Sequence, residues 1–507
     1  MRILKSHWVR RIVALPIALS LFVGAQVALA APTYLQISGA GSTWSQNALD
    51  QWRKNVAANY GMTVNYTGTG SSAGRAEFIK QTVDFAVSEI PFQSAPEDGS
   101  SPEVSPVSFA YMPIVAGGTS LMYNLKIAGK RVTNLRLSGE VIAKIFTGQI
   151  TNWNDAAIAA DNPGLAMPDK SIVVVARSDG SGSSAQFTLW MSKKYGSIWT
   201  YGLRSQYPQF SGFKYQAGSN GVSGYVSQDY GEGAITYVEY SYALEAGFPV
   251  AKVLNDSNYY VEPTAQSVAV ALLSAGINSD LTQNLDAVYS NSDPRSYPLS
   301  SYSYMIVPTE ATRVFTAEKG ATLGAFAQYM LCEGQQQAED LGYSPLPMNL
   351  VQSGFDQIRK IPGAQSISVD LASCNNPTFK PGDSPSNNLL ATTAPQPAEC
   401  DKKGANQCTT GTAGAAGTET EVSGTGSGGS ALSSSGGSSA GSGSSSGSAL
   451  GGSSGAVTGG ASPFALPDDP WGGQQFLMFL AVLFVVGVVV VPPLLWNRLP
   501  RSFRSRN

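Results

Sequence analysis

Short apolar strands alternate with amphipathic helices between about residues 33 and 373, and this alternation limits the possible folds more than any other feature. Segments rich in Val, Ile, Tyr and Phe predict strands at 62–68, 83–89, 171–177 and 234–240. Apolar residues at helical spacing predict helices at 43–59, 140–148 and 184–194. The expected fold is therefore an α/β domain with mostly parallel sheets.

The composition changes from about residue 375 onward. Residues 409–462 are almost wholly Gly, Ser, Thr and Ala, which cannot bury a hydrophobic core. We therefore expect residues 374–470 to form a disordered tether that follows the folded domain.

Residues 476–496 form an uncharged run that is long enough to span a bilayer. Trp471 and Trp496 flank this run, and four arginines follow it. We predict a transmembrane helix over 474–497 and a basic cytoplasmic tail over 498–507. A buried core helix is the alternative for the run, but its length and the arginines behind it argue against that alternative.

Residues 1–30 have the pattern of a secretory signal peptide: a basic start, a short apolar stretch and a small-residue cleavage site at 28–30. A retained N-terminal anchor is the alternative. No Cys follows the apolar stretch directly, so the lipoprotein route is not expected. The two ends together predict an exported domain that a C-terminal helix tethers to the cell membrane.

The expected extracytoplasmic part, residues 31–470, is acidic. It holds 24 of the 32 Lys and Arg residues and all 35 Asp and Glu residues, so its net charge is −11. Nucleic acid is not expected as a partner, because phosphate backbones bind basic surfaces. The sole histidine, His7, lies in the predicted signal peptide, which excludes a Ser-His-Asp triad and a His-ligated metal. We expect no enzyme activity, no cofactor and no metal.

The chain has an even number of cysteines, which suggests disulfides in an exported protein. We expect the pairs Cys332–Cys374 and Cys400–Cys408, although four cysteines allow three pairings. A zinc site is the weaker alternative, because the spacings lack a C-x₂-C pair.

Three loops rich in Gly and hydroxyl side chains lead into predicted helices: GAGSTWSQNAL (39–49), YTGTGSSAGRAEF (66–78) and ARSDGSGSSAQFTLWM (176–191). Each places free backbone N–H groups at a helix N-terminus, where the helix dipole favours an anion. One such loop alone is more often an ordinary helix cap. Three in one domain, one of them with Arg177, favour an anion site. None of them matches a nucleotide-binding motif.

Taken in chain order, several segments resemble the phosphate-binding proteins of ABC-type phosphate uptake systems: GAGSTW, YTGTGSSAG, VDFAVSE, ARSDGSGSS, GEGAITYVEYSYA and LGYSPLP. The segment 142–168 resembles that family as well, and the whole resemblance covers about residues 38–350. It implies a two-lobed, periplasmic-binding-protein-like (type II) fold in which phosphate is held between the lobes.

The resemblance also implies how the chain divides between these lobes. Lobe 1 is expected at 33–115 and 251–373, and lobe 2 at 116–250. Opening and closing would then occur about hinges near 114–118 and 240–256.

Eight residues of this chain match the positions at which the family binds phosphate: Thr43, Trp44 (through its N–H), Ser71, Glu89, Arg177, Ser181, Gly182 and Ser183. Arg177 offers a planar pair of donors that suits two oxygens. Asp179 is implied as the residue that holds Arg177, and a plain turn-forming Asp is the alternative.

Glu89 departs from the family, which usually has Asp at this position. A carboxylate in an anion site can accept the proton that phosphate still carries near neutral pH, whereas sulfate has no such proton and would be repelled. The longer Glu side chain puts the affinity and the selectivity of the site in doubt. A Glu89 turned toward solvent is the alternative.

The implied function is capture of inorganic phosphate outside the cell by a monomer, which delivers it to an ABC permease with its ATPase. A different oxyanion, such as arsenate or an organophosphate, is one alternative. A surface-anchored oxyanion-binding sensor or adhesin that delivers to no permease is another. A secreted phosphohydrolase is disfavoured, because histidine and paired metal-binding carboxylates are lacking.

Overall fold

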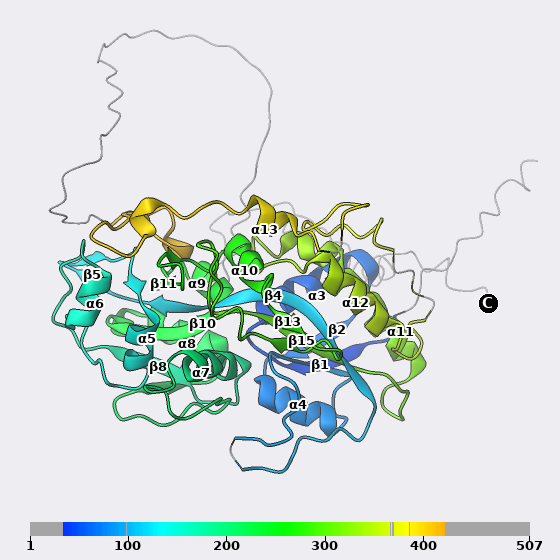
Figure 1. Cartoon of the computed structure of the whole chain (residues 1–507). Coiled ribbons are helices and arrows are strands. Elements are labelled where there is room, and N and C mark those ends of the chain that lie inside the picture. The colour runs from blue at the N-terminus through cyan, green and yellow to red at the C-terminus, as the bar shows by residue number, and fades with distance from the viewer. Residues whose placement is uncertain (1–33, 98, 366, 368–369, 385, 421–507) are drawn as a thin grey trace, which may run out of the picture. The chain divides into compact units, whose positions relative to one another are not determined.

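The computed structural model describes residues 34–97, 99–365, 367, 370–384 and 386–420 (Figure 1). The predicted signal peptide, transmembrane helix and cytoplasmic tail all lie outside these residues, as does most of the Gly/Ser-rich stretch. Within the described part of the chain, no helix has the length and apolar character needed to cross a membrane.

Lobe 1 begins with β1 (Ile37–Gly41), α3 (Gln46–Tyr60), β2 (Val64–Thr67), α4 (Ser71–Ile79), β3 (Phe85–Ser88) and the first part of β4 (Phe109–Tyr123). The chain later returns to it with α10 (Ala265–Leu272), β13 (Gly276–Ile277), β14 (Gln283–Asn284), β15 (Ser300–Pro308), α11 (Ala317–Leu331), η2 (Glu333–Gln337) and α12 (Met348–Ile358).

Lobe 2 lies between these two parts in the sequence. It comprises β5 (Lys126–Ile127), β6 (Lys130–Arg131), β7 (Arg136–Leu137), α5 (Gly139–Ile145), α6 (Ala156–Asp161), β8 (Val173–Arg177), α7 (Gly182–Lys194), β9 (Lys214–Gln216), α8 (Gly218–Ser227), η1 (Asp229–Gly231), β10 (Ala234–Glu239), α9 (Tyr240–Glu245), β11 (Lys252–Leu254) and β12 (Tyr260–Val261).

All four predicted strands and all three predicted helices form, with ends shifted by a few residues. The first helix begins at Gln46 instead of residue 43, because the preceding residues form the turn after β1. Its apolar face, which includes Ala48, Trp52 and Val56, is buried as the spacing predicts. Gly61 ends this helix in the left-handed conformation, with φ of 67°.

One eight-stranded sheet runs through both lobes in the order β2-β1-β3-β15-β4-β10-β8-β9. The strands at its two ends pair in parallel. In its middle, β15 runs antiparallel to β3 and β4, and β4 runs antiparallel to β10. The sheet is therefore mixed, which corrects the prediction of mostly parallel sheets. The antiparallel pairs of this sheet all involve β4 or β15, which were not among the predicted strands. Both strands are buried along most of their length, so they lack the alternation of apolar and polar residues that marks a half-buried strand.

The two lobes are joined by two crossing segments that touch each other. Strand β4 pairs with β15 as far as Gly118 and with β10 from Thr119 onward, so it passes between lobes there. The second crossing lies at Pro263, between β12 in lobe 2 and α10, which packs against β15. A Cβ atom on Gly118 would lie 2.5 Å from Cβ of Pro263, so this close approach requires glycine.

The first crossing, between Gly118 and Thr119, lies at the end of the segment 114–118 that the resemblance implied as a hinge. The second lies about a dozen residues beyond the predicted boundary at residue 250, because β11 pairs with β7 and so still belongs to lobe 2. Short strands such as these give no sequence signal of the lobe to which they belong.

The folded part extends further than predicted at its C-terminal end. Residues 375–384 and 386–420 were assigned to a disordered tether, but they are folded against the domain and include α13 (Leu389–Thr393), η3 (Glu399–Asp401) and η4 (Ala413–Ala415). Their composition is polar, but hydrogen bonds, an ion pair and a small apolar cluster hold them to the domain, which composition does not reveal. The predicted disulfides Cys332–Cys374 and Cys400–Cys408 both form.

Candidate functional site

Two of the three predicted Gly- and hydroxyl-rich loops meet directly between the lobes. The backbone N–H of Ser72, in the first turn of α4, donates to the carbonyl oxygen of Gly180 at 3.1 Å. A Cβ atom on Gly182 would overlap the Glu89 carboxylate and lie 2.7 Å from Ser71 Oγ. The N-termini of α4 and α7 therefore converge on Glu89, and glycine at the start of α7 permits this approach.

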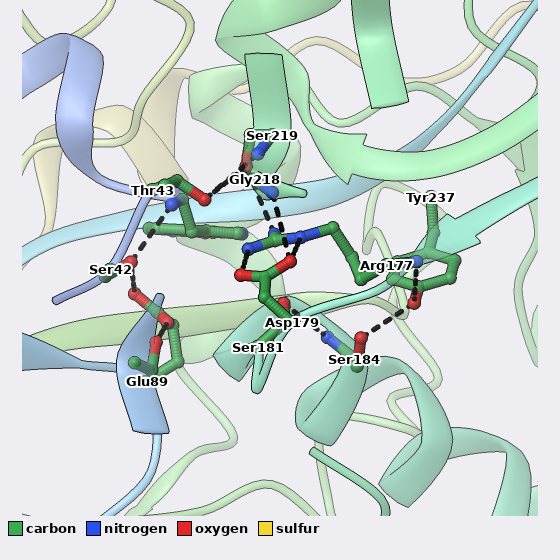
Figure 2. A network of polar contacts seen from close by, with 12 residues as sticks. Ser42, Thr43, Glu89, Arg177, Asp179, Ser181, Ser184, Gly218, Ser219 and Tyr237 are labelled. Carbon is green, nitrogen blue, oxygen red and sulfur yellow. Dashed lines mark hydrogen bonds and ion pairs between the residues drawn. The ribbon is translucent and has the colours of Figure 1, made fainter. Parts of the chain in front are cut away.

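The remaining loop, which follows β1, contacts the loop before α4 directly, because the N–H of Gly70 donates to the carbonyl oxygen of Gly41 at 2.8 Å. It meets lobe 2 at a fourth junction that was not predicted. Strand β9 leads into α8, whose first residue Gly218 has φ of 69°. Ser219 donates its N–H to Thr43 Oγ1 at 3.1 Å, and the two hydroxyl oxygens are 2.9 Å apart (Figure 2). The signal was available but weaker, because the stretch 216–221 (QAGSNG) also combines Gly and Ser at the start of a helix and has only one hydroxyl side chain.

Arg177, the last residue of β8, is buried, with 2% of its surface exposed. Its Nε and Nη2 donate to the two carboxylate oxygens of Asp179 at 2.7 and 2.5 Å (Figure 2). Its Nη1 lies 3.4 Å from Ser219 Oγ. One edge of the guanidinium is thus fixed by a two-pronged ion pair, as expected for Asp179, and the other edge faces the hydroxyls.

The Asp179 carboxylate is stabilised in its charged form. Burial raises the pKa of this carboxyl, but the hydrogen bonds and the charge of Arg177 outweigh burial, so the net pKa is lowered. The N–H of Gly218 also donates to Asp179 Oδ1 at 3.0 Å. Asp179 therefore fixes both Arg177 and the start of α8.

Glu89 follows β3 and is 1% exposed, so the alternative in which it faces solvent is wrong. Its Oε1 accepts hydrogen bonds from Ser42 Oγ at 2.5 Å and Ser303 Oγ at 2.9 Å, and its Oε2 accepts one from Ser71 Oγ at 2.8 Å. Burial raises the pKa of the Glu89 carboxyl, and the three hydroxyls and the charge of Arg177 offset this rise only in part.

Among the remaining predicted residues, some polar groups already have hydrogen-bond partners within the protein and one has none among the described residues. The N–H of Trp44 donates to Ser42 Oγ at 3.0 Å, within its own turn. Ser181 Oγ accepts from the N–H of Ser184 at 3.2 Å, as a helix cap does. Ser183 is 1% exposed, and its hydroxyl has no hydrogen-bond partner among the described residues. All eight predicted residues are buried, and they lie around one region between the lobes.

Three further residues belong to this arrangement and were not predicted. Ser42 and Ser303 hold the Glu89 carboxyl. The hydroxyl of Tyr237, in β10, accepts from the N–H of Arg177 at 3.1 Å and bonds Ser184 Oγ at 2.7 Å (Figure 2). Ser303 and Tyr237 lie on strands, where a serine or tyrosine carries no local sign of a site.

Comparison with known proteins places the chain in a family. A model described as a PBP superfamily domain matches residues 26–333, and the chain belongs to this superfamily. Within it, the chain is similar to proteins named phosphate-binding protein PstS. The one from Xylella fastidiosa (strain Temecula1) is 34% identical over 322 residues, which are 63% of this chain and 83% of the relative.

Other relatives give a similar result. PstS of Pasteurella multocida is 32% identical over 62% of this chain and 88% of its own length. PstS 2 of Mycobacterium tuberculosis is 31% identical over 62% and 83%. A solved phosphate ABC transporter substrate-binding protein from Clostridium perfringens is 19% identical over 62% of this chain and 100% of its own, with a TM-score of 0.42. Because that score is low, the family assignment depends on the sequence matches.

Glu89→Gln is expected to raise the free energy of unfolding of the ligand-free protein, and to raise it more at pH 7 than at pH 5. The folded-state pKa of Glu89 is raised, so the stability from this group is present at low pH and is lost as the pH rises through that pKa. Each pKa unit corresponds to about 1.4 kcal/mol. Urea unfolding at both pH values measures the effect.

Glu140→Gln provides the control for this comparison. The Glu140 side chain is 61% exposed at the start of α5, so its replacement should change stability by less than ~0.5 kcal/mol at either pH. An effect of Glu89→Gln that is the same at pH 5 and pH 7 would contradict this prediction. It would show that burial in the folded state does not raise the pKa of the Glu89 carboxyl.

Proposed function

We propose that this chain binds inorganic phosphate outside the cytoplasm and delivers it to an ABC-type permease with its ATPase, and that it performs no chemistry itself. The observation that carries the proposal is the burial of Arg177 and its pairing with one carboxylate. Arg177 is a buried cation with a single carboxylate on one edge, and Ser219, in the first turn of α8, lies 3.4 Å from its Nη1 on the other edge. Relatives named phosphate-binding proteins support the same assignment.

The donors of the site suit a tetrahedral anion. The helix dipoles favour negative charge at the starts of α4 and α7, where the N–H groups of Ser72 and Ser184 already donate to Gly180 and Ser181 and the remaining first-turn N–H groups are the proposed donors. The proposed ligands are the predicted set: Thr43, Trp44, Ser71, Glu89, Arg177, Ser181, Gly182 and Ser183. The unpartnered hydroxyl of Ser183 fits this role, because a buried hydroxyl without a partner is costly.

Glu89 is the proposed basis for selectivity. Its carboxylate is buried, and the hydroxyls of Ser42, Ser71 and Ser303 leave it as an acceptor that faces the site. Phosphate can share a proton with such a group, whereas sulfate brings none and would meet a carboxylate without relief. Ser42, Ser71 and Ser303 fix the position of the longer Glu side chain.

Phosphate can enter this site only if the lobes separate. The lobes touch across it through Ser72 and Gly180, and through Thr43 and Ser219. Gly118 and Pro263 are the proposed hinge points, since the chain changes lobe at both. Phosphate would enter when the lobes open about these two crossings, and it would be enclosed when they close.

Export and membrane anchoring complete the proposal. The two disulfides suit an oxidising compartment outside the cytoplasm. The signal peptide at 1–30 and the transmembrane helix at 474–497 rest on the sequence pattern alone.

Purified residues 31–420 are expected to bind phosphate and to reject sulfate. At a phosphate concentration a thousand times Kd, the free energy of unfolding should rise by about 4 kcal/mol. Titration calorimetry and thermal melts with each anion test this expectation. Equal binding of sulfate would refute the role of Glu89, and no binding of either anion would refute the proposed function.

Arg177→Lys is expected to weaken phosphate binding about ten- to a hundredfold, because it keeps the charge but loses one prong of a charge-assisted interaction of about 1.5–3 kcal/mol. Asp179→Asn should weaken binding less, since it only loosens the guanidinium. Arg359→Lys, at the exposed residue that follows α12, serves as the control. Calorimetric titration of the three variants decides the matter, and normal binding by Arg177→Lys would mean that the site lies elsewhere.

A stop after Ala465 is expected to release a folded, phosphate-binding protein into the medium, because it removes the uncharged run 476–496. The full chain should remain with the membrane fraction. Immunoblots of medium and membranes, together with phosphate titration of the released protein, measure both outcomes. A truncated protein that stays with the membrane would show that another segment is the anchor.

A further inference from the structure

The last described segment, residues 386–420, passes from lobe 1 to lobe 2, and we call it the strap (Figure 1). On lobe 1, helix α13 packs against α10. Leu390, Ala391 and Ala394 share a small buried apolar cluster with residues of α10. Arg295 Nη1 donates to the carbonyl oxygens of Ala391 and Ala394 at 3.1 and 3.2 Å. The first part of the strap is therefore fixed to lobe 1.

The second part of the strap is fixed to lobe 2. Lys252 Nζ donates to both carboxylate oxygens of Asp401 at 2.7 and 2.9 Å, and these side chains are only 12% and 10% exposed. Thr412 Oγ1 donates to the carbonyl oxygen of Val250 at 2.6 Å and accepts from its N–H at 3.0 Å. These contacts lie on β11 and the residues just before it, which are part of lobe 2.

A buried arginine of lobe 2 holds the loop that the Cys400–Cys408 disulfide closes. Arg136 is 1% exposed, and its Nη1 donates to the carbonyl oxygens of Cys400 and Asn406 at 3.1 and 2.8 Å. Its guanidinium also stacks over the Tyr260 ring at 4.5 Å. Detaching this loop would leave a buried cation without these partners, which is costly.

The strap has little slack between its two attachments. Residues 395–398 lead from Ala394, which is buried on lobe 1, to Glu399, whose carboxylate is 3.5 Å from the Tyr259 hydroxyl on lobe 2. Even when fully extended, these five steps span at most about 18 Å. Two of the four residues, Pro395 and Pro397, stiffen the segment further.

This short segment runs beside the second crossing between the lobes. Residues 394–398 line the same pocket as Glu262 and Thr264, which flank Pro263. The backbone N–H of Ala413 also donates to Glu262 Oε1 at 2.6 Å. A rotation of the lobes about Gly118 and Pro263 would therefore change the separation that the strap has to bridge.

From these contacts we infer that the strap is a third connection between the lobes, which restricts their opening and favours the arrangement in which they touch. A ligand that binds the closed form gains apparent affinity when more of the free protein is already closed. This part of the inference rests on the proposed function, whereas the restriction of lobe motion does not.

The test lengthens the strap without removing a contact. Six residues, Gly-Ser-Gly-Ser-Gly-Ser, are inserted between Gln396 and Pro397 in the full chain. The same insertion between Gly436 and Gly437, in the Gly/Ser-rich stretch, is the matched control. Double replacement Pro395→Gly and Pro397→Gly is a milder variant of the same change, should the insertion impair folding.

Lobe opening is measured by spin-label distances between Lys80→Cys on lobe 1 and Lys214→Cys on lobe 2, both at exposed positions. Without phosphate, the loosened strap should give longer and broader distances than the control, and phosphate should bind about three- to tenfold more weakly. Unchanged distances in a folded variant would overturn the inference. If no variant or wild type binds phosphate, the proposed function fails, and the distances still decide the role of the strap.

Discussion

Strand β4 belongs to the sheets of both lobes, and the arrangement of the lobes depends on this shared strand. It pairs with β15 up to Gly118 and with β10 from Thr119 onward, so the chain changes lobe where the partner of this strand changes. Pro263 packs against Gly118 at the same point. The loops that carry the candidate site extend from strands on both sides of this junction, so their meeting depends on the angle between the lobes.

The charges and hydrogen bonds of the site are determined by the burial of its residues. A buried ion pair such as Arg177 with Asp179 is favourable only when its geometry is good, and here two hydrogen bonds provide that geometry. Glu89 lies nearby without a cation of its own, so burial raises its pKa and hydroxyls take the place of water. One fixed cation, one buried carboxyl and several N–H and O–H donors therefore lie together between the lobes, which is the arrangement on which the proposed phosphate site rests.

Much of this arrangement could be predicted from the sequence, and the parts that could not share a cause. Strands such as β8 and helices such as α7 were predictable because their apolar periodicity is local. The same holds for the Gly- and Ser-rich loop between them. By contrast, Ser303 and Tyr237 lie on ordinary strands and reach the site only through the pairing of the sheet. The strap was expected to be part of a tether, because its composition resembles that of a disordered segment and its partners, such as Arg136 and Lys252, lie far away in the sequence.

The sequence by itself determined the chemistry that is available. It has hydroxyls and glycines at helix N-termini, one arginine with an aspartate two residues later, and no histidine after residue 7. Its even number of cysteines also suggested two disulfides, although three pairings were possible. Only the tertiary structure decided that the four loops meet, that Glu89 faces inward, and that residues 386–420 bridge the lobes. These features depend on contacts between residues far apart in the chain, and local composition does not encode such distances.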